Sequence, residues 1–204
     1  MENETIGVLL IISCLCIATP TTYARKQLSP TARGGGNAWL QTSFRGNENI
    51  TKIHFYVHDV RSGPNATTYE VATSSITSNS STSFGQIKVY DDRATAEPDI
   101  NSEEVARAQG LATSADLQNR AVAMNLNFVL TSGEFNGSTI SVVGRNQVGN
   151  PSREMTVVGG TVPFRSARGY VVTSTYFDSA DYSILEYTIY ASYSYIDLGL
   201  WTDI

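Results

Sequence analysis

One carboxylate follows a run of alternating apolar residues in the stretch TKIHFYVHD, residues 51–59. The apolar side chains of this run are Ile53, Phe55 and Val57, which share one face of a strand. Asp59 continues the same face. Because burial raises the pKa of a carboxyl group, Asp59 could hold a proton near neutral pH and act as a general acid. The alternative is that Asp59 ends the strand and bonds the backbone of the turn RSGPNA.

Four arginines lie in the segment TVVGGTVPFRSARGY, residues 156–170, or just before it. They are Arg145, Arg153, Arg165 and Arg168. Arg153 shares its parity with the apolar residues of its strand, so we expect its side chain to point inward. There it could hold Asp59 ionised, bind a phenolate or form a structural salt bridge. Arg145 is a further candidate for the site. Arg165 and Arg168 are predicted to be solvated or to fix the turn.

The sequence lacks the residue patterns of several common classes of functional site. No GxxxxGK[ST] loop occurs, and Gly159 and Gly160 are interpreted as a strand-end turn. His54 and His58 are four residues apart on the polar face of one strand, about 13 Å from each other, so they cannot bind one metal ion together. No serine lies in a GxSxG turn, and a hydrolase triad would lack its base. We therefore expect neither a metal nor another cofactor.

The charge and composition exclude two classes of partner. The formal net charge is −5, which argues against binding to nucleic acid or to a membrane surface, since both attract basic proteins. Tyrosine (11) greatly exceeds tryptophan (2), and threonine, serine and valine are abundant. This composition favours strands and turns over helices.

Residues 1–24 have the form of a signal peptide. Their apolar run, residues 6–18, is shorter than the roughly 20 residues that span a bilayer, and small residues follow it. Both cysteines, Cys14 and Cys16, lie in this run and would be removed with it. Secretion to the extracellular space is therefore predicted, without a disulfide. The candidate glycosylation sites, each in an Asn-x-Ser/Thr triplet, are Asn49, Asn65, Asn79 and Asn136.

The remaining sequence predicts strands separated by short turns. Residues 25–49 are expected to be a flexible lead-in, 50–196 the folded domain and 197–204 a C-terminal tail. The clearest alternation lies in AVAMNLNFVL and SILEYTIYASYSY. FGQIKVYDD is predicted to be a strand that ends at its two aspartates. NSEEVARAQGLATSADL is ambiguous, and a short helix capped by Ser102 is one interpretation.

Eight or nine strands with short turns predict an all-β fold. Both a sandwich and a barrel meet this pattern, and we favour an eight-stranded antiparallel β-barrel. Closure removes exposed strand edges, and a barrel of eight strands is wide enough for one small ligand.

Six segments resemble, in the same order, the signature segments of the plant dirigent family: FYVHDV, GPNAT, FGQIKVYDD, VARAQG, FNGSTISVVGRN and SREMTVVGGTVPFRSARGY. The resemblance runs from about Ile53 to Tyr195. It implies an eight-stranded antiparallel barrel, a homotrimer, secretion to the apoplast, glycosylation and no redox centre.

The resemblance also implies a function. Many members bind phenoxy radicals that a separate oxidase, a laccase or peroxidase, supplies, and they direct the coupling to one stereoisomer, as in lignan formation from coniferyl alcohol. Our first expectation is such a stereo-directing protein for phenylpropanoids. The alternative is a lyase that forms a quinone methide and closes a ring on a flavonoid-type alcohol, as in the pterocarpan-forming branch, to which the GRN…REM…VVGGT…F…ARGY pattern is similar. A third possibility is a carrier that sequesters a phenolic compound.

Carried over by position, Asp59 and Arg153 match the pocket aspartate and arginine of the family. Asn146 stands where lignan-forming members have a second aspartate, and an amide cannot supply a proton. The candidate catalytic residues are thus Asp59, Asn146 and Arg153. The segment after ARAQG carries LATS in place of the family's pocket tyrosines. The residues expected to contact substrate are Phe55, Ala112, Ser114, Phe128, Arg145 and Thr175.

Overall fold

The computed structural model describes residues 38–45 and 48–194, and these form strands joined by turns and two short 3-10 helices. The strands are β1 (Leu40–Arg45), β2 (Glu48–Val60), β3 (Thr68–Ala72), β4 (Ile87–Thr95), β5 (Glu104–Ser114), β6 (Ala121–Leu130), β7 (Thr139–Gln147), β8 (Arg153–Gly160), β9 (Arg168–Asp178) and β10 (Tyr182–Tyr193), and the helices are η1 (Thr77–Asn79) and η2 (Gly133–Phe135). In this part of the chain, no helix is long and apolar enough to cross a bilayer.

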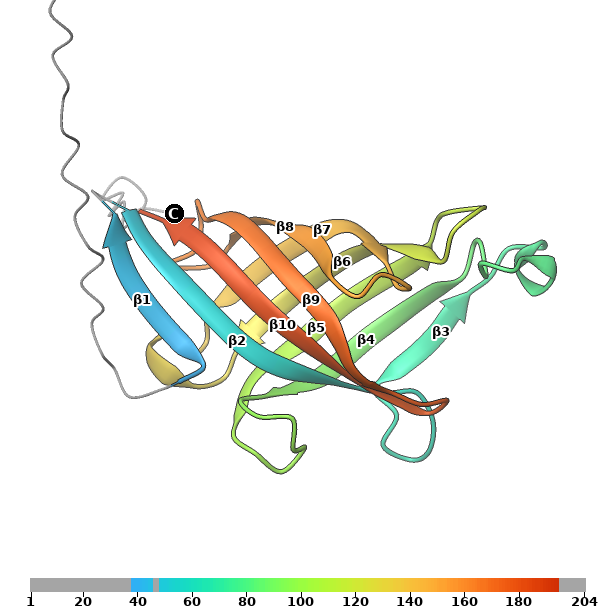
Figure 1. The fold of residues 1–204 in the computed structure, drawn as a ribbon, viewed down its shortest axis with the longest axis horizontal. Coiled ribbons are helices and arrows are strands. Elements are labelled where there is room, and N and C mark those ends of the chain that lie inside the picture. Colours follow the sequence, from blue (N-terminus) through green and yellow to red (C-terminus); the bar gives the residue numbers. More distant parts are fainter. Residues whose placement is uncertain (1–37, 46–47, 195–204) are drawn as a thin grey trace, which may run out of the picture.

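Eight of the strands close into an antiparallel barrel (Figure 1). Going round it, the order is β2, β10, β9, β8, β7, β6, β5 and β4, and a pairing of β2 with β4 completes the circle. The remaining strands extend this sheet, β1 alongside β2 and β3 alongside β4. The predicted eight-stranded antiparallel barrel is confirmed.

The folded domain begins earlier than the sequence predicted. Residues 25–49 were expected to be a flexible lead-in, but Leu40–Arg45 form β1 and pair with β2. The physical reason is burial, because Trp39 and Leu40 are 5% and 8% exposed and belong to the apolar core. The predicted signal peptide, residues 1–24, and the predicted tail, residues 197–204, lie outside the described residues.

The segment around VARAQG is a strand, which contradicts the helix interpretation. Its small residues alternate rather than follow a helical period, so that they line one face of β5, and they are Ala106, Ala108, Gly110, Ala112 and Ser114. Ser102 caps no helix, and its hydroxyl donates to the carbonyl of Glu97 at 3.2 Å. Because these inward residues are small, β5 leaves open space inside the barrel.

Aromatic side chains fill the barrel at two levels. Phe55, Phe128 and Tyr187 contact one another with ring centroids 5.2 to 6.0 Å apart. A second cluster, formed by Phe135, Phe164 and Tyr193, has centroids 4.8 to 6.1 Å apart. Rings packed at these distances exclude water, so only the end of the barrel beyond the first cluster remains for a ligand.

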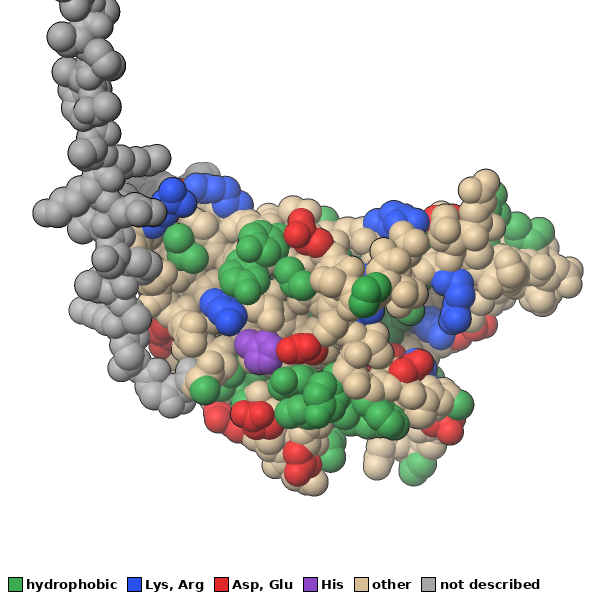
Figure 2. All heavy atoms as spheres, in the orientation of Figure 1, with side chains coloured by type: hydrophobic (Ala, Val, Ile, Leu, Met, Phe, Trp, Pro, Cys, Tyr) green, Lys and Arg blue, Asp and Glu red, His purple; other side chains and the backbone are tan. Residues whose placement is uncertain are grey.

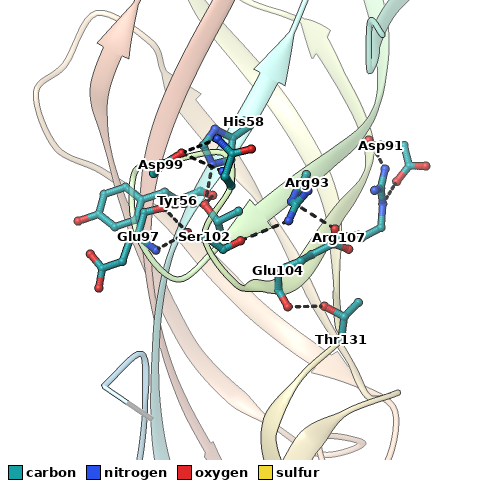
Figure 3. A network of polar contacts seen from close by, with 12 residues as sticks. Tyr56, His58, Asp91, Arg93, Glu97, Asp99, Ser102, Glu104, Arg107 and Thr131 are labelled. Atoms are coloured by element: carbon teal, nitrogen blue, oxygen red, sulfur yellow. Dashed lines mark hydrogen bonds and ion pairs between the residues drawn. The ribbon is translucent and has the colours of Figure 1, made fainter.

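The closing seam of the barrel is short and has a histidine on its outer face. Three residue pairs join β2 to β4, Tyr56 with Thr95, Val57 with Ala94, and His58 with Arg93. The loop between β4 and β5 covers this seam, and Figure 3 shows Asp99 of the loop beside His58. Although the sequence placed His58 on a polar face, its side chain is only 1% exposed.

The hydrogen bonds of His58 place a proton on Nε2, and its burial keeps the ring neutral. Thr95 Oγ1 donates to the carbonyl of Glu97 at 2.7 Å, so it accepts from His58 Nε2 at 2.6 Å. His58 Nδ1 is then unprotonated and accepts from the Tyr182 hydroxyl. Burial, helped by the charge of Arg93, lowers the pKa of His58 from 6.5 to about 4.

The four sequons lie in different surroundings. Asn65 and Asn136 are exposed on the turns after β2 and β6, and Asn79 is exposed at the end of η1. Asn49 lies within β2, paired with Phe44 on one side and Tyr193 on the other. The described structure therefore presents three of these asparagines to solvent and holds the fourth in the sheet.

We predict that the contribution of His58 to stability is lost in acid. A folded pKa below the unfolded value makes this contribution complete above about pH 6.5 and reduces it as the pH falls toward 4. Urea unfolding should show His58→Gln destabilised by roughly 1–3 kcal/mol at pH 7.5. The difference from the parent should shrink by about 2 kcal/mol at pH 5, from 1.36 kcal/mol per unit. A difference that stays constant with pH would contradict the neutral, buried ring.

Candidate active site

A cavity of about 590 Å³ opens at the end of the barrel beyond the aromatic clusters. The three candidate catalytic residues, Asp59, Asn146 and Arg153, all line it. So do three of the six predicted substrate contacts, namely Ala112, Ser114 and Thr175. The cavity is large enough for a compound of two or three rings, since pockets for small molecules measure about 300–1,000 Å³.

Asp59 points inward from β2, as the alternation predicted. It is 8% exposed and accepts a hydrogen bond from Thr68 Oγ1 at 2.6 Å. Its nearest cation is Arg61, whose Nη1 lies 3.7 Å from Asp59 Oδ2. The strand continues to Val60, so Asp59 does not serve as the end of the strand. Asp59 is thus a pocket residue, and Arg61 rather than Arg153 balances its charge.

A second buried carboxyl group lies across the seam from Asp59. The register that pairs His58 with Arg93 places Asp92 opposite Asp59 when continued by one residue. Asp92 is 2% exposed and accepts a hydrogen bond from Thr67 Oγ1 at 2.5 Å. Burial raises the pKa of Asp92 to about 7, and the charge of Asp59 adds to this effect while Thr67 opposes it. We refer to Asp59 and Asp92 as the carboxyl pair.

Arg153 is buried in the wall of the cavity without a carboxylate partner among the described residues. It is 6% exposed, and its Nη1 donates to the carbonyl of Asn150 and to Thr175 Oγ1, both at 3.0 Å. Its Nε has no hydrogen-bond partner in this part of the chain. Burial lowers the pKa of Arg153, although a guanidinium stays charged. An anionic group on a ligand would offset this buried charge.

Asn146 offers a second unpaired polar atom to the cavity. Its side chain is 6% exposed, and its Nδ2 contacts Met124 Sδ at 3.1 Å. Within the described structure, its Oδ1 has no partner. A buried acceptor without a hydrogen bond is costly, so a hydroxyl group of a ligand would be bound favourably here.

Two tyrosines near the carboxyl pair remain neutral. Tyr90 lines the cavity, and burial together with the charges of Asp59 and Asp92 raises its pKa. Tyr187 lies in the aromatic cluster beneath, and burial raises its pKa to about 12. Both hydroxyl groups are therefore hydrogen-bond donors or acceptors and not anions near pH 7.

Three of the predicted substrate contacts lie elsewhere. Phe55 and Phe128 are both 0% exposed and pack on Tyr187, because each is four residues deeper along its strand than a cavity residue. Arg145 follows the opposite parity to Asn146, so it points outward and pairs with Asp116 at 2.7 Å. These placements correct the predicted lining of the pocket.

The other arginines of the predicted cluster lie outside the cavity. Arg168 forms an ion pair with Glu48 at the opposite end of the sheet. Arg165 is exposed in the turn after β8. Both placements agree with a solvated or structural role. Gly160 belongs to β8, and an added Cβ would lie 2.0 Å from the carbonyl oxygen of Thr139, so a close approach of strands and not a strand-end turn requires glycine there.

A family model described as Dirigent-like protein matches residues 50–192. The chain belongs to the dirigent family. It is 39% identical to Dirigent protein 11 of Arabidopsis thaliana, over 89% of this chain and 90% of that protein. It is 36% identical to Pterocarpan synthase 1 of Glycine max, over 95% of this chain and 100% of that protein. Among solved structures, a pterocarpan synthase dirigent protein is 36% identical, with a TM-score of 0.66, and the match covers 74% of this chain and 88% of that chain.

Sequence reasoning missed two charged residues close to Asp59 in this dirigent barrel. The adjacent Asp91 and Asp92 were interpreted as a turn, whereas both lie within β4. Asp92 shares its parity with Tyr90 and Ala94, and this alternation was the available signal. Arg61 was assigned to the turn after β2, and its pairing with Asp59 depends on a turn geometry that alternation does not describe.

We predict that Asp92→Asn stabilises the protein at higher pH. Asp92 has a folded pKa above its unfolded value, so the parent loses stability as the pH rises from about 4 to 7. Relative to the parent, Asp92→Asn should therefore gain roughly 2–4 kcal/mol between pH 4 and pH 8, at 1.36 kcal/mol per unit. Urea unfolding at both pH values measures this change.

Asp91→Asn is the matched control for this experiment. Asp91 is on the outer face of the same strand, and its hydrogen bond from Arg107 lowers its pKa. Its substitution should make the protein less stable at pH 8 than at pH 4, relative to the parent. Equal behaviour of the two variants would show that Asp92 does not retain its proton in the folded barrel.

Proposed function

We propose that this dirigent-family protein is a lyase that removes water from a phenolic alcohol and closes a ring on the resulting quinone methide. The observation that carries the proposal is the carboxyl pair, because Asp92 holds a proton near neutral pH and Asp59 lines the cavity beside it. A protein that only orients radicals has no use for a stored proton. Two carboxyl groups whose environments differ are the usual arrangement of an acid and its conjugate partner.

The proposed reaction depends on Arg153 and the carboxyl pair. Arg153 binds the phenolate oxygen of the substrate, and the carboxyl pair donates a proton to the benzylic hydroxyl. The carbon–oxygen bond then breaks, water leaves with the bonding electrons, and electrons of the phenolate form the neutral quinone methide. A second hydroxyl of the substrate adds to the methide carbon, which restores the phenolate and returns a proton to the carboxyl pair. The net change is the loss of one water.

Thr68 connects the two carboxyl groups in this scheme. Its hydroxyl donates to Asp59 at 2.6 Å, and it also contributes to the environment of Asp92. Since Asp92 is almost completely buried, Asp59 is the carboxyl group that meets substrate. Asp92 then acts as a positioning residue that supplies protons to Asp59 from behind.

The relatives support the same choice. Proteins named pterocarpan synthase, from Glycine max and Glycyrrhiza echinata, match 95% and 93% of this chain at 36% identity. A structural neighbour, also a pterocarpan synthase dirigent protein, is 36% identical. A flavonoid-type alcohol is therefore the first substrate class to test.

Stereo-directed radical coupling is the second candidate. Its support is the pair of unpaired polar atoms, Arg153 Nε and Asn146 Oδ1, which could fix a phenoxy radical in one orientation. A laccase or peroxidase would then supply the radicals, and no proton transfer by the carboxyl pair would be needed.

We also propose that the protein is secreted and forms a homotrimer. Hydrophobic side chains gather on the outer face over β2, β9 and β10 (Figure 2). Tyr170 and Tyr190 stack there at 4.9 Å, and Tyr176 and Phe177 are 58% and 48% exposed. Large exposed apolar areas favour subunit contacts, and light scattering of the secreted protein should give three times the protomer mass. A monomer at micromolar concentration would contradict this.

One assay separates the candidate functions. We predict turnover of a 2-hydroxy or benzylic flavonoid-type alcohol without oxidant, which liquid chromatography on a chiral column would detect. Asp59→Asn should lower kcat by about 10²- to 10⁴-fold, the usual contribution of acid–base catalysis. The rate should fall above pH 7, where Asp92 loses its proton.

The same preparation, supplied with coniferyl alcohol and a one-electron oxidant, tests the second candidate. Enantiomeric excess there, without turnover of the alcohol, would replace the lyase by a stereo-directing protein. Binding with neither activity would leave a carrier. The control variant is Glu48→Gln at the opposite end of the sheet, which removes a carboxylate that pairs with Arg168 outside the cavity.

A further inference from the structure

Positive charge is concentrated at the cavity although the chain as a whole is acidic. Of the 14 lysines and arginines, four line the cavity, whereas only two of the 19 acidic residues do. The basic residues are Arg61, Lys88, Arg120 and Arg153, and the acidic ones are Asp59 and Asp178. A reaction on a neutral phenolic alcohol requires at most one of these cations.

One arginine forms ion pairs with both of the carboxylates that line the cavity. Arg61 lies 3.7 Å from Asp59 and 3.0 Å from Asp178. Glu70 pairs with Lys88 across the β3–β4 ladder, but its carboxylate accepts a hydrogen bond from Gln86 instead. Among the described residues, Lys88, Arg120 and Arg153 therefore have no carboxylate within ion-pair distance.

Lys88 and Arg120 both line the cavity near β5. Lys88 on β4 pairs with Ala112 of β5, and Ser114 of β5 pairs with Val122 of β6, two residues after Arg120. The β5 side chains in this part of the lining, Ala112 and Ser114, are small. They leave space for a flat group that approaches the two cations.

The cavity also contains buried polar atoms that lack partners. Arg153 and Asn146 are each 6% exposed, and Arg153 Nε and Asn146 Oδ1 have no hydrogen bond within the described structure. Arg153 Nε and Asn146 Oδ1 can form hydrogen bonds with a phenol oxygen, which is the reacting end of the substrate. Lys88, on β4, and Arg120, immediately before β6, can bind a second group.

We infer that the natural substrate carries a carboxylate in addition to its phenol, and that Lys88 and Arg120 bind this carboxylate. The inference rests on the proposed phenolic function and narrows its substrate class to phenolic alcohols that also carry a carboxylate. A carboxylate is planar and fits between an ammonium and a guanidinium group above Ala112 and Ser114.

Three probes with the same phenol ring test this inference: ferulate, methyl ferulate and coniferyl alcohol. Isothermal titration of the full secreted chain at pH 6.5 and low salt should give a Kd for ferulate about tenfold lower than for methyl ferulate, as expected for two partly exposed charge contacts. Raising the salt concentration should reduce this ratio, because exposed charges are screened. Coniferyl alcohol should resemble the methyl ester.

The double variant Lys88→Met/Arg120→Gln should lower the ferulate preference to about twofold or less and leave the Kd of methyl ferulate unchanged. The matched control is Lys52→Met/Arg165→Gln, which removes the same charges from residues that do not line the cavity. Its preference should equal that of the parent. Thermal unfolding of both variants verifies that the barrel is intact.

The outcomes are distinct from those of the lyase assay. Equal Kd values for ferulate and its ester, or no ferulate binding at millimolar concentration, would overturn the inference. A ferulate preference that persists in the double variant would overturn the assignment to Lys88 and Arg120. Loss of turnover with an intact ferulate preference would instead count against the proposed lyase and leave the carboxylate site standing.

Discussion

The closure of the barrel between β2 and β4 determines where the carboxyl pair lies in this protein. The register of that seam sets Asp59 opposite Asp92 on the inner face, and like charges in opposite positions of a sheet repel. Burial is the main reason that Asp92 keeps its proton, the charge of Asp59 adds to this effect, and Arg61, Thr67 and Thr68 surround the two groups. A buried proton donor is thus a consequence of how the sheet closes.

The closing seam has a buried titratable group on each of its faces, and both groups are uncharged. His58 and Asp59 are neighbours in the chain and point to opposite faces, so one strand contributes a buried titratable group to each. Burial keeps His58 unprotonated outside and Asp92 protonated inside, with pKa values of about 4 and 7. Between these values the seam carries the least charge.

Alternation within single strands predicted much of this arrangement. It did not predict which residues of distant strands lie opposite each other. The alternation of β2 and β10 correctly indicated which side chains point inward, Asp59 included. A strand of alanine and glycine lacks that contrast, so β5 was ambiguous. Asp92 was missed because two adjacent aspartates are typical of a turn, whereas pairing with Gln109 and Ala108 of β5 holds both in a strand. Likewise, Arg61 reaches Asp59 through a turn, whereas Arg153, the predicted partner, bonds Asn150 and Thr175.

Stereochemical control follows from the positions of the polar groups, whichever reaction the cavity supports. The carboxyl pair belongs to β2 and β4, Asn146 and Arg153 belong to β7 and β8, and Lys88 and Arg120 stand beside β5. A substrate bound at three separate places can present only one of its faces to an attacking group. Small residues on β5 leave the space for this, while the aromatic cluster beneath prevents deeper entry. Orientation therefore comes from the rigid barrel, and the charges at the cavity decide which end of the substrate lies inward.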